Sequence, residues 1–408
     1  MTPHPGSWLR LVAVSAAFAT AVVVATGQWS DSHEASVLAA LALVVTVWLS
    51  ARFAHPDDRL LNRAAAVALG LFIVQIAVGG VVALADDPGW ASGAHIAFGA
   101  LSLAASVVTA ALVFRPGVEA PSAPWRDYVT LTKPRIMSLL LITGAGGLVL
   151  GSEGLPSLGL TVATLGGLAL ACGGASALNH VLDRDIDQLM GERTQARPVA
   201  SGRVAPARAL EFGLALLAAS FVVLACYVNL LTAVLAMVGG AFYVLVYTRW
   251  LKRSTPQNIV IGGAAGAVPP VVGWTAATGN LTLPALLLFL IVFFWTPPHF
   301  WALALLIRRN YEAAGVPMLP VVKGDRETAR SIVRYSVVMV AITLLPVFAH
   351  TVGLLYLGSA LVLGAIFLWL AVALTRATTP VRAKRLFSYS LLYLALLFVA
   401  LAVDPVVL

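Results

Sequence analysis

Long apolar runs recur along almost the whole chain, and they limit its fold more than any other feature of the sequence. Of the 408 residues, 60% are hydrophobic and only 11% are charged, and the mean hydropathy is +0.92. A water-soluble chain of this size carries far more charge, whereas a helix that crosses a bilayer needs about 20 mostly apolar residues. The runs have that length, so the sequence predicts an all-α integral membrane protein.

Thirteen of these runs are expected to be transmembrane helices. Their approximate limits are 9–27, 35–53, 63–85, 94–114, 134–151, 158–182, 208–227, 229–248, 257–276, 281–307, 332–351, 353–375 and 386–404. Little more than Asn229 separates the seventh run from the eighth, so these two helices must be joined by a tight turn.

The basic residues predict how the helices are oriented. If the N-terminus is cytoplasmic and the runs alternate in direction, all 26 Lys and Arg residues fall on the cytoplasmic side. The only charged residues on the opposite side are then acidic, namely Asp31, Glu34, Asp86, Asp87, Glu153 and Asp404. Lys and Arg concentrate on the cytoplasmic side of membrane proteins, so we expect a multi-pass protein of the cell (inner) membrane with its charged chemistry on the cytoplasmic face. The net charge of +8 therefore reflects orientation rather than binding to nucleic acid.

The segment 115–124 has the composition of a linker, because it is rich in Pro and small residues. It separates an expected four-helix domain, residues 1–115, from an expected nine-helix domain, residues 125–408, with residues 116–124 between them. The two cysteines, Cys172 and Cys226, lie within apolar runs, so neither a disulfide nor a cysteine metal site is expected.

Asn179, Asp183 and Asp187 recur every four residues near the inner end of the sixth run. On a helix, each step of four residues turns through about 400°, so the three side chains share one face at intervals of about 6 Å. Neighbouring carboxylates repel each other unless a cation lies between them, and Mg²⁺ commonly binds one or two carboxylates together with substrate phosphates. The motif predicts a Mg²⁺–diphosphate site; the plainer alternative is a solvated helix end with paired acids.

Basic residues on the same membrane face could hold the diphosphate. Arg and Lys beside a metal bind phosphate oxygens and neutralise a leaving diphosphate. The candidates are Lys133, Arg135, Arg193, Arg197, Lys252, Arg253 and Lys323. Each of them alone is better explained as an anchor that obeys the positive-inside rule, so only the face that they share with the acidic motif favours a site.

Seven ordered sequence blocks lie between residues 131 and 322. They are LTKPRI (131–136), NHVLDRDID (179–187), RTQARP (193–198), YTRWLKRSTPQN (247–258), IGGAAGAVPP (261–270), WTPPHFW (295–301) and GVPMLPVV (315–322). With these blocks, the stretch from about residue 125 to residue 405 resembles the intramembrane prenyltransferases of the UbiA superfamily, and within it the protohaem IX farnesyltransferases.

This resemblance implies a nine-helix bundle with a cavity that opens inward. It implies that farnesyl diphosphate binds through Mg²⁺ to Asn179, Asp183 and Asp187, and that basic residues stabilise the departing diphosphate. A vinyl group of haem b would then attack the farnesyl cation, and water would complete the product, haem O. His299, in the block WTPPHFW, would contact the porphyrin, whereas by itself it is equally well explained as a hydrogen-bonding residue of the bundle.

One region departs from the family pattern. The superfamily usually carries a second acidic motif after the sixth helix of the bundle, where this chain has Asn310 and, close by, only Glu312. Three alternatives follow: one metal suffices, Glu312 or Asp325 replaces the acid, or basic residues hold the diphosphate there. We favour the basic residues, which are Arg308, Arg309, Lys323 and Arg326.

Two histidines mark the first four helices. His33 opens the second run and His95 opens the fourth, both at the outer end. Two such histidines can bind one haem iron in a four-helix bundle, although two interfacial histidines are the simpler interpretation. The segments QIAVGG, P-x-W and HIA between residues 75 and 97 resemble one half of haem A synthase, which implies a haem b site. Most of a core about 30 Å thick separates it from the acidic motif, so this haem would not be the substrate.

Two other functions stay open on the sequence alone. The acceptor could be a quinone precursor or another aromatic compound, or the chain could be a non-catalytic haem-binding membrane protein, which would leave the acidic motif without a role. The expected partners are farnesyl diphosphate, haem b and the lipid bilayer, with haem A synthase or a terminal oxidase assembly as a protein partner.

Overall fold

The computed structural model describes residues 7–26, 33–84, 89–114, 123–349 and 351–407, and within them it contains helices and no strands. Eleven helices of this part of the chain are long and apolar enough to cross a membrane. The predicted fold class, an all-α membrane protein, is therefore confirmed. Two shorter apolar stretches, Ser7–Thr20 and Ala97–Val113, belong to the first and fourth helices, so the full count of thirteen spans stays a prediction.

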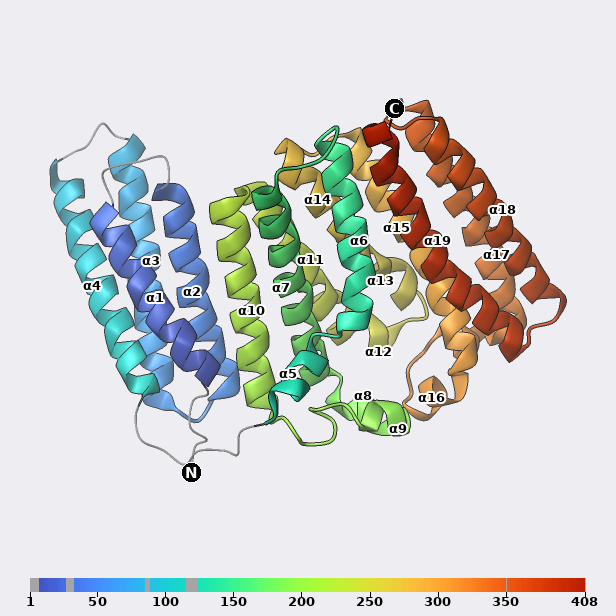
Figure 1. The fold of residues 1–408 in the computed structure, drawn as a ribbon. Coiled ribbons are helices and arrows are strands. Elements are labelled where there is room, and N and C mark those ends of the chain that lie inside the picture. The colour runs from blue at the N-terminus through green and yellow to red at the C-terminus, as the bar shows by residue number, and fades with distance from the viewer. Residues whose placement is uncertain (1–6, 27–32, 85–88, 115–122, 350, 408) are drawn as a thin grey trace.

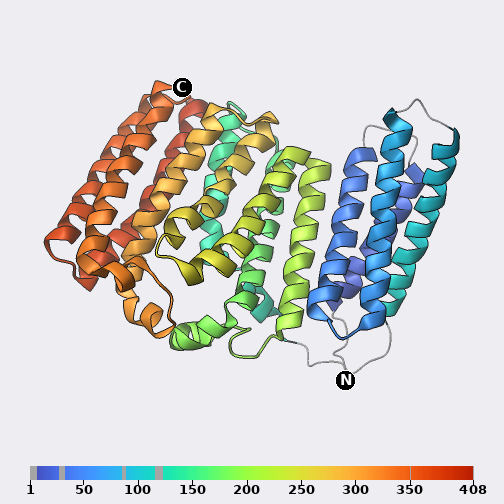
Figure 2. The ribbon, with the colours of Figure 1, turned by 180° about the vertical axis from the view of Figure 1, so that it is seen from behind.

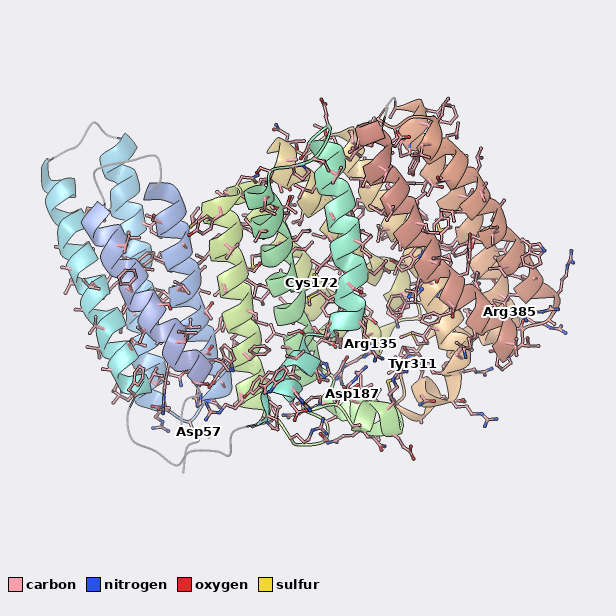
Figure 3. All side chains as sticks on the ribbon, viewed as in Figure 1. Asp57, Arg135, Cys172, Asp187, Tyr311 and Arg385 are labelled. Carbon is pink, nitrogen blue, oxygen red and sulfur yellow. The ribbon has the colours of Figure 1, made fainter. Side chains whose placement is uncertain are left out.

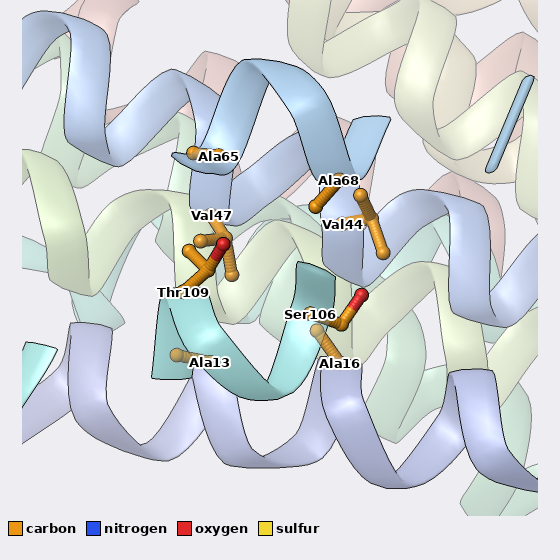
Figure 4. Close-up of a pocket in the computed structure, with 8 residues that line it drawn as sticks. All are labelled: Ala13, Ala16, Val44, Val47, Ala65, Ala68, Ser106 and Thr109. Carbon is orange, nitrogen blue, oxygen red and sulfur yellow. The ribbon is translucent and has the colours of Figure 1, made fainter. Parts of the chain in front are cut away.

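The first four helices form a bundle at one end of the molecule (Figure 1). They are α1 (Ser7–Thr26), α2 (His33–Ala54), α3 (Arg59–Leu84) and α4 (Gly89–Val113). Small side chains fill the centre of this bundle, and they let membrane helices approach closely. A cavity of about 10 Å³ at the centre is lined by Ala13, Ala16, Val44, Val47, Ala65, Ala68, Ser106 and Thr109 (Figure 4). It holds about one water molecule, so the centre of the bundle has no room for a porphyrin.

The other long helices form a larger bundle beside the first (Figures 1 and 2). They are α6 (Pro134–Gly151), α7 (Leu158–Leu182), α10 (Pro206–Tyr227), α11 (Leu230–Ala241), α13 (Asn258–Gly266), α14 (Val268–Thr278), α15 (Leu283–Leu306), α17 (Leu319–Phe348), α18 (Leu354–Arg376) and α19 (Pro380–Val407). A π-helix, η1 (Phe242–Leu251), and the short α12 (Lys252–Ser254) continue α11. Proline lies in the first turn of six of these helices, where its missing N–H costs no intrahelical hydrogen bond.

Four short helices lie at one edge of the molecule, which we call the inner edge after the predicted orientation. They are α5 (Trp125–Leu131), α8 (Arg184–Leu189), α9 (Glu192–Gln195) and α16 (Arg308–Ala313). The helix α1 begins at this edge and α19 ends at the opposite one (Figure 1). Ends at opposite edges are expected for a chain that crosses the membrane an odd number of times.

The inner connections contain more helix than the sequence indicated. Residues 183–208 include α8 and α9, and α17 begins at Leu319 rather than near residue 332. Gly324, with φ 77° and ψ 170°, interrupts the helical conformation of α17. The first part of α17 carries Lys323, Asp325 and Arg326, and this charge hides it from a search for apolar runs.

The two bundles contact each other directly along α10. Trp8 of α1 packs on Phe212 with ring centroids 4.9 Å apart, and Tyr128 of α5 lies 5.1 Å from the same ring. At the same boundary, Nε2 of His55 lies 2.6 Å from a carboxylate oxygen of Glu211. Residues 115–122, most of the expected linker, lie outside the described residues, so the domain limits stay a prediction.

Helices α6 and α14 pack with almost no side chain between them. A Cβ added to Gly273 would lie 1.9 Å from the carbonyl oxygen of Gly144, and one added to Gly147 would lie 2.1 Å from that of Pro270. Only glycine permits such a backbone contact, which is typical of membrane helices. Because α6 begins directly after Lys133, this contact also positions that lysine.

We expect Gly273→Ala to lower the free energy of unfolding of the purified protein by roughly 1–3 kcal/mol, because the two backbones would have to separate. The control is Gly166→Ala in α7, where nothing lies within 4 Å of the added Cβ, and which should be neutral or slightly stabilising. Unfolding in mixed micelles measures both variants. Equal stability of the two would contradict the backbone contact.

Candidate active site

The acidic motif lies at the junction of α7 and α8. Asp183 has φ −90° and ψ 2°, so the two helices are separate. The i to i−4 hydrogen bonds nevertheless continue, because the amide of Asp183 donates to Asn179 at 2.9 Å and the amide of Asp187 donates to Asp183 at 2.8 Å. The expected stacking is therefore kept through the junction. Asn179, Asp183 and Asp187 are 3%, 1% and 1% exposed, so the motif is not a solvated helix end.

Each polar side chain of the motif has one basic partner from another part of the chain. Nζ of Lys133 donates to Oδ1 of Asn179 at 2.6 Å, and Nζ of Lys252 donates to Oδ2 of Asp183 at 2.6 Å. Arg197 donates to Oδ1 of Asp187, also at 2.6 Å. The structure thus brings together three of the seven predicted basic residues with all three predicted metal ligands.

Two carboxylate oxygens of the motif have no hydrogen-bond partner although they are buried. They are Oδ1 of Asp183 and Oδ2 of Asp187. An unsatisfied buried carboxylate oxygen is costly unless a cation or another donor binds it. Among the described residues, no three His, Cys, Asp or Glu side chains lie close enough to hold a metal together. This donor set of two carboxylates and one amide fits Mg²⁺, which takes its other ligands from phosphate and water.

Asn179 is oriented by a residue that the sequence did not point to. Its amide Nδ2 donates to Oδ2 of Asp183 at 2.8 Å and to Oγ1 of Thr248 at 3.0 Å. Thr248 lies in the π-helix η1, where its hydroxyl donates to the carbonyl of Tyr243 at 2.9 Å. Single π-helical turns are common at functional sites. No sequence signal predicts the π-helix, so Thr248 was missed.

Burial and neighbouring charges shift the pKa values of ionisable groups in and beside the motif. Burial, together with the charge of Arg197, lowers the pKa of Lys133 to about 7. Burial also raises the pKa of Asp187, against the opposing effect of its hydrogen bond from Arg197. Asp185 points elsewhere and forms a bidentate pair with Arg253 at 2.7 Å for both bonds, which lowers its pKa to about 2. Arg253 therefore pairs with Asp185, and not with the motif.

The remaining predicted basic residues make no contact with the motif. Arg135, Arg193 and Lys323 are exposed, and Figure 3 shows Arg135 at the same edge as Asp187 and Tyr311. Exposed side chains of this kind can still turn toward an incoming anion.

The region that lacks the second acidic motif has a structural role. Nδ2 of Asn310 donates to the carbonyl of Met190, which ties α16 to the connection after α8. Gly191, with φ 98°, leaves room for it, since an added Cβ would lie 2.8 Å from Nδ2 of Asn310. Glu312 is exposed and Asp325 lies 3.0 Å from Arg308. Neither acid reaches the first motif through a recorded contact.

His299 lies apart from the acidic motif, in α15, and it is 7% exposed. Its Nδ1 lies 2.6 Å from Oγ of Ser390 in α19. Of the two N-terminal histidines, the side chain of His33 lies outside the described residues. Nδ1 of His95 donates to the carbonyl of Gln75 at 3.2 Å, and Gly79 faces the imidazole, since an added Cβ would lie 2.8 Å from it.

Comparison with known proteins places these features in a family. The UbiA prenyltransferase family matches residues 140–400. The protoheme IX farnesyltransferase of Roseiflexus sp. is 47% identical over 90% of this chain and 73% of its own length. The one from Symbiobacterium thermophilum is 54% identical over 68% of this chain and 94% of its own length.

Solved structures agree with this at the level of the fold. A structure of digeranylgeranylglyceryl phosphate synthase superposes with a TM-score of 0.59 at 18% identity, over 70% of this chain and 99% of that one. A UbiA homologue from Aeropyrum pernix gives 0.55 at 20% identity, over 66% and 97%. The expected membrane prenyltransferase fold is confirmed, and the chain belongs to the UbiA prenyltransferase family, in which its close relatives are protoheme IX farnesyltransferases.

Proposed function

We propose that the protein transfers the farnesyl group of farnesyl diphosphate to a vinyl group of haem b and so makes haem O. The observation that carries this is the buried stack of Asn179, Asp183 and Asp187, with two unpartnered carboxylate oxygens and three cations around it. Such a stack suits a magnesium diphosphate. The choice of farnesyl and haem rests on the relatives, which are named protoheme IX farnesyltransferases.

Asp183 and Asp187 would hold Mg²⁺ through Oδ1 and Oδ2, respectively, with the amide oxygen of Asn179 beside them. When bound, the metal supplies positive charge that stabilises the diphosphate as it leaves. Lys133, Lys252 and Arg197 already lie at hydrogen-bonding distance from the three ligands. A diphosphate on the metal gives these cations a second set of oxygens, so they exchange a carboxylate or amide partner for the substrate.

The rest of the reaction depends on position and on the exclusion of water. The bond between the farnesyl carbon and the diphosphate oxygen breaks, and the three cations neutralise the leaving group. The electrons of a haem vinyl group form the new carbon–carbon bond, and water adds to the product cation with loss of a proton. The apolar helices keep water from the first cation, which would otherwise be hydrolysed.

We further propose that the inner edge faces the cytoplasm in the cell membrane and that Arg135, Arg193 and Lys323 turn toward the diphosphate when it binds. The asymmetric distribution of all 26 basic residues supports the orientation. The exposed positions of these three side chains leave them free to move. Asn310 binds the carbonyl of Met190, which supports a diphosphate site with a single acidic motif and basic residues opposite it.

Asp183→Asn and Asp187→Asn should each lower the formation of haem O by more than about 100-fold, because loss of a metal ligand costs at least as much as loss of a group that supports one. The matched control is Asp185→Asn, two residues away, whose carboxylate pairs with Arg253. The assay supplies farnesyl diphosphate, Mg²⁺ and haem b, with quinone precursors as competing acceptors. Full activity of both variants would refute the metal site, and prenylation of the quinones alone would refute the acceptor.

Lys252→Met should separate metal binding from diphosphate binding. Without the lysine, no side-chain ammonium competes with Mg²⁺ for the carboxylate of Asp183, so Mg²⁺ alone should bind more tightly. Pyrophosphate with Mg²⁺ should bind about 10–100-fold more weakly, because a hydrogen bond between charged groups contributes about 1.5–3 kcal/mol. Calorimetric titration measures both affinities. The control is Arg334→Met on the exposed surface, where Arg334 pairs with Glu327 at 2.6 Å; the same change in both variants would rule out the exchange of partners.

We also propose that the N-terminal bundle binds haem b at its outer end through His33 and His95. Since a carbonyl oxygen only accepts, Nδ1 of His95 carries the proton and Nε2 keeps a lone pair for iron. Gly79 gives the ring its room, and the filled centre of the bundle leaves only the end for a porphyrin.

His95→Ala should abolish a low-spin bis-histidine haem spectrum of the purified protein. Gly79→Leu should weaken it, since the side chain would displace the imidazole. The control is Gly70→Ala in the same helix, where nothing lies within 4 Å of the added Cβ. An unchanged spectrum in the His95 variant would disprove this haem site, and the proposed prenyl transfer would not be contradicted by that result.

A further inference from the structure

The imidazole of His299 is held between two aromatic rings. Trp295, one helical turn earlier in α15, stacks on one face with centroids 4.4 Å apart and planes 15° from parallel. Phe387 of α19 covers the other face at 4.9 Å and 24°. With both faces covered, only the edges of the ring can meet another group. The orientation of this histidine is therefore fixed before any ligand arrives.

Ser390 determines which nitrogen of His299 carries the proton. Its hydroxyl donates its single hydrogen to the carbonyl of Phe387 at 2.7 Å. The oxygen can then only accept from Nδ1 of His299, 2.6 Å away. Nδ1 is consequently protonated and Nε2 has a lone pair. The backbone of Ser390 also accepts a hydrogen bond from the indole of Trp295 at 2.9 Å, so one residue of α19 positions both rings.

This arrangement is that of a metal-binding histidine. A neutral imidazole that donates from one nitrogen to an oxygen commonly binds a metal through the other. In the described part of the chain, no side chain is recorded as a hydrogen-bond partner of Nε2. This nitrogen is not among the buried polar atoms that lack a partner, so an incoming group can reach it. An accessible nitrogen with a lone pair on a fixed imidazole indicates a ligand.

His299 is also at a depth that suits the acceptor. It precedes Leu306, at the inner end of α15, by seven residues, or about 10 Å of helix. The diphosphate motif lies at the inner edge, at the end of α7. A ligand on His299 would thus lie deeper in the bundle than the diphosphate, where an apolar acceptor belongs.

We propose that Nε2 of His299 binds the iron of the acceptor haem and that Ser390 is the positioning residue that keeps this nitrogen unprotonated. This inference rests on the proposed haem O synthesis. It adds a basis for specificity: the site distinguishes a porphyrin that contains iron from one that does not. No bond of the haem changes in this step, since the nitrogen only donates its lone pair to the metal.

Removing the ligand should remove the preference for iron. The full-length protein is assayed with farnesyl diphosphate and either haem b or metal-free protoporphyrin IX, as substrate or as competitor. His299→Ala should raise the KM for haem at least about 10-fold and leave the KM for farnesyl diphosphate and the affinity for metal-free porphyrin unchanged. In His299→Gly, added imidazole should restore the preference. A preference for haem that survives in His299→Ala would overturn the proposal.

Ser390→Ala tests the positioning role with the ligand still present. Without the acceptor at Nδ1, the other tautomer is populated, and the KM for haem should rise about 10–100-fold with little change in kcat. Ser336→Ala is the matched control, since Ser336 is also fully buried and donates to a helix carbonyl at 2.7 Å. Equal losses for haem and metal-free porphyrin in Ser390→Ala would mean a merely structural role. An unaltered protein that makes no haem O would instead refute the proposed function.

Discussion

The pairing of buried carboxylates with basic side chains from distant parts of the chain organises the inner end of the prenyltransferase bundle. Asp183 and Asp187 are each 1% exposed, and an unpaired carboxylate in such a place would cost several kcal/mol. Lys252 reaches Asp183 from the end of η1, and Arg197 reaches Asp187 from the segment after α9. These charges join chain segments that are distant in sequence.

The same charges explain why the metal and the diphosphate belong together. Two carboxylates and the three cations Lys133, Lys252 and Arg197 leave an excess of one positive charge when all are ionised. Burial lowers the pKa of Lys133 to about 7, so this lysine loses its proton as the pH rises through neutrality and the excess disappears. Mg²⁺ alone would add two charges to a site that has no net negative charge to offset them. A magnesium diphosphate, which is anionic, would be attracted instead.

The features that follow from local geometry could be predicted from the sequence. The stack of Asn179, Asp183 and Asp187 depends only on a spacing of four residues, and it survives the break at Asp183 because the i to i−4 hydrogen bonds continue. The long helices follow from apolar runs of sufficient length. The predicted family rests on the ordered sequence blocks between residues 131 and 322.

The contacts between distant segments could not be predicted, because they depend on which helices become neighbours. Lys252 and Arg253 are adjacent in sequence, yet one pairs with Asp183 and the other with Asp185, since they lie on different sides of α12. Ser390 follows His299 by 91 residues, and nothing in its surroundings marks it. Thr248 acts through a π-helix, which has no recognised sequence pattern.

The boundary between the two bundles follows the same rule of paired buried charge. Glu211 of α10 is 1% exposed, and it lies 2.6 Å from His55, which follows α2 and is 3% exposed. Arg208, one turn before Glu211, lies 3.8 Å from its other carboxylate oxygen. In this chain, Glu211 would be exposed to lipid or water if the first four helices moved away, so this charge binds the N-terminal bundle to the enzyme more specifically than the apolar contacts around Trp8 alone.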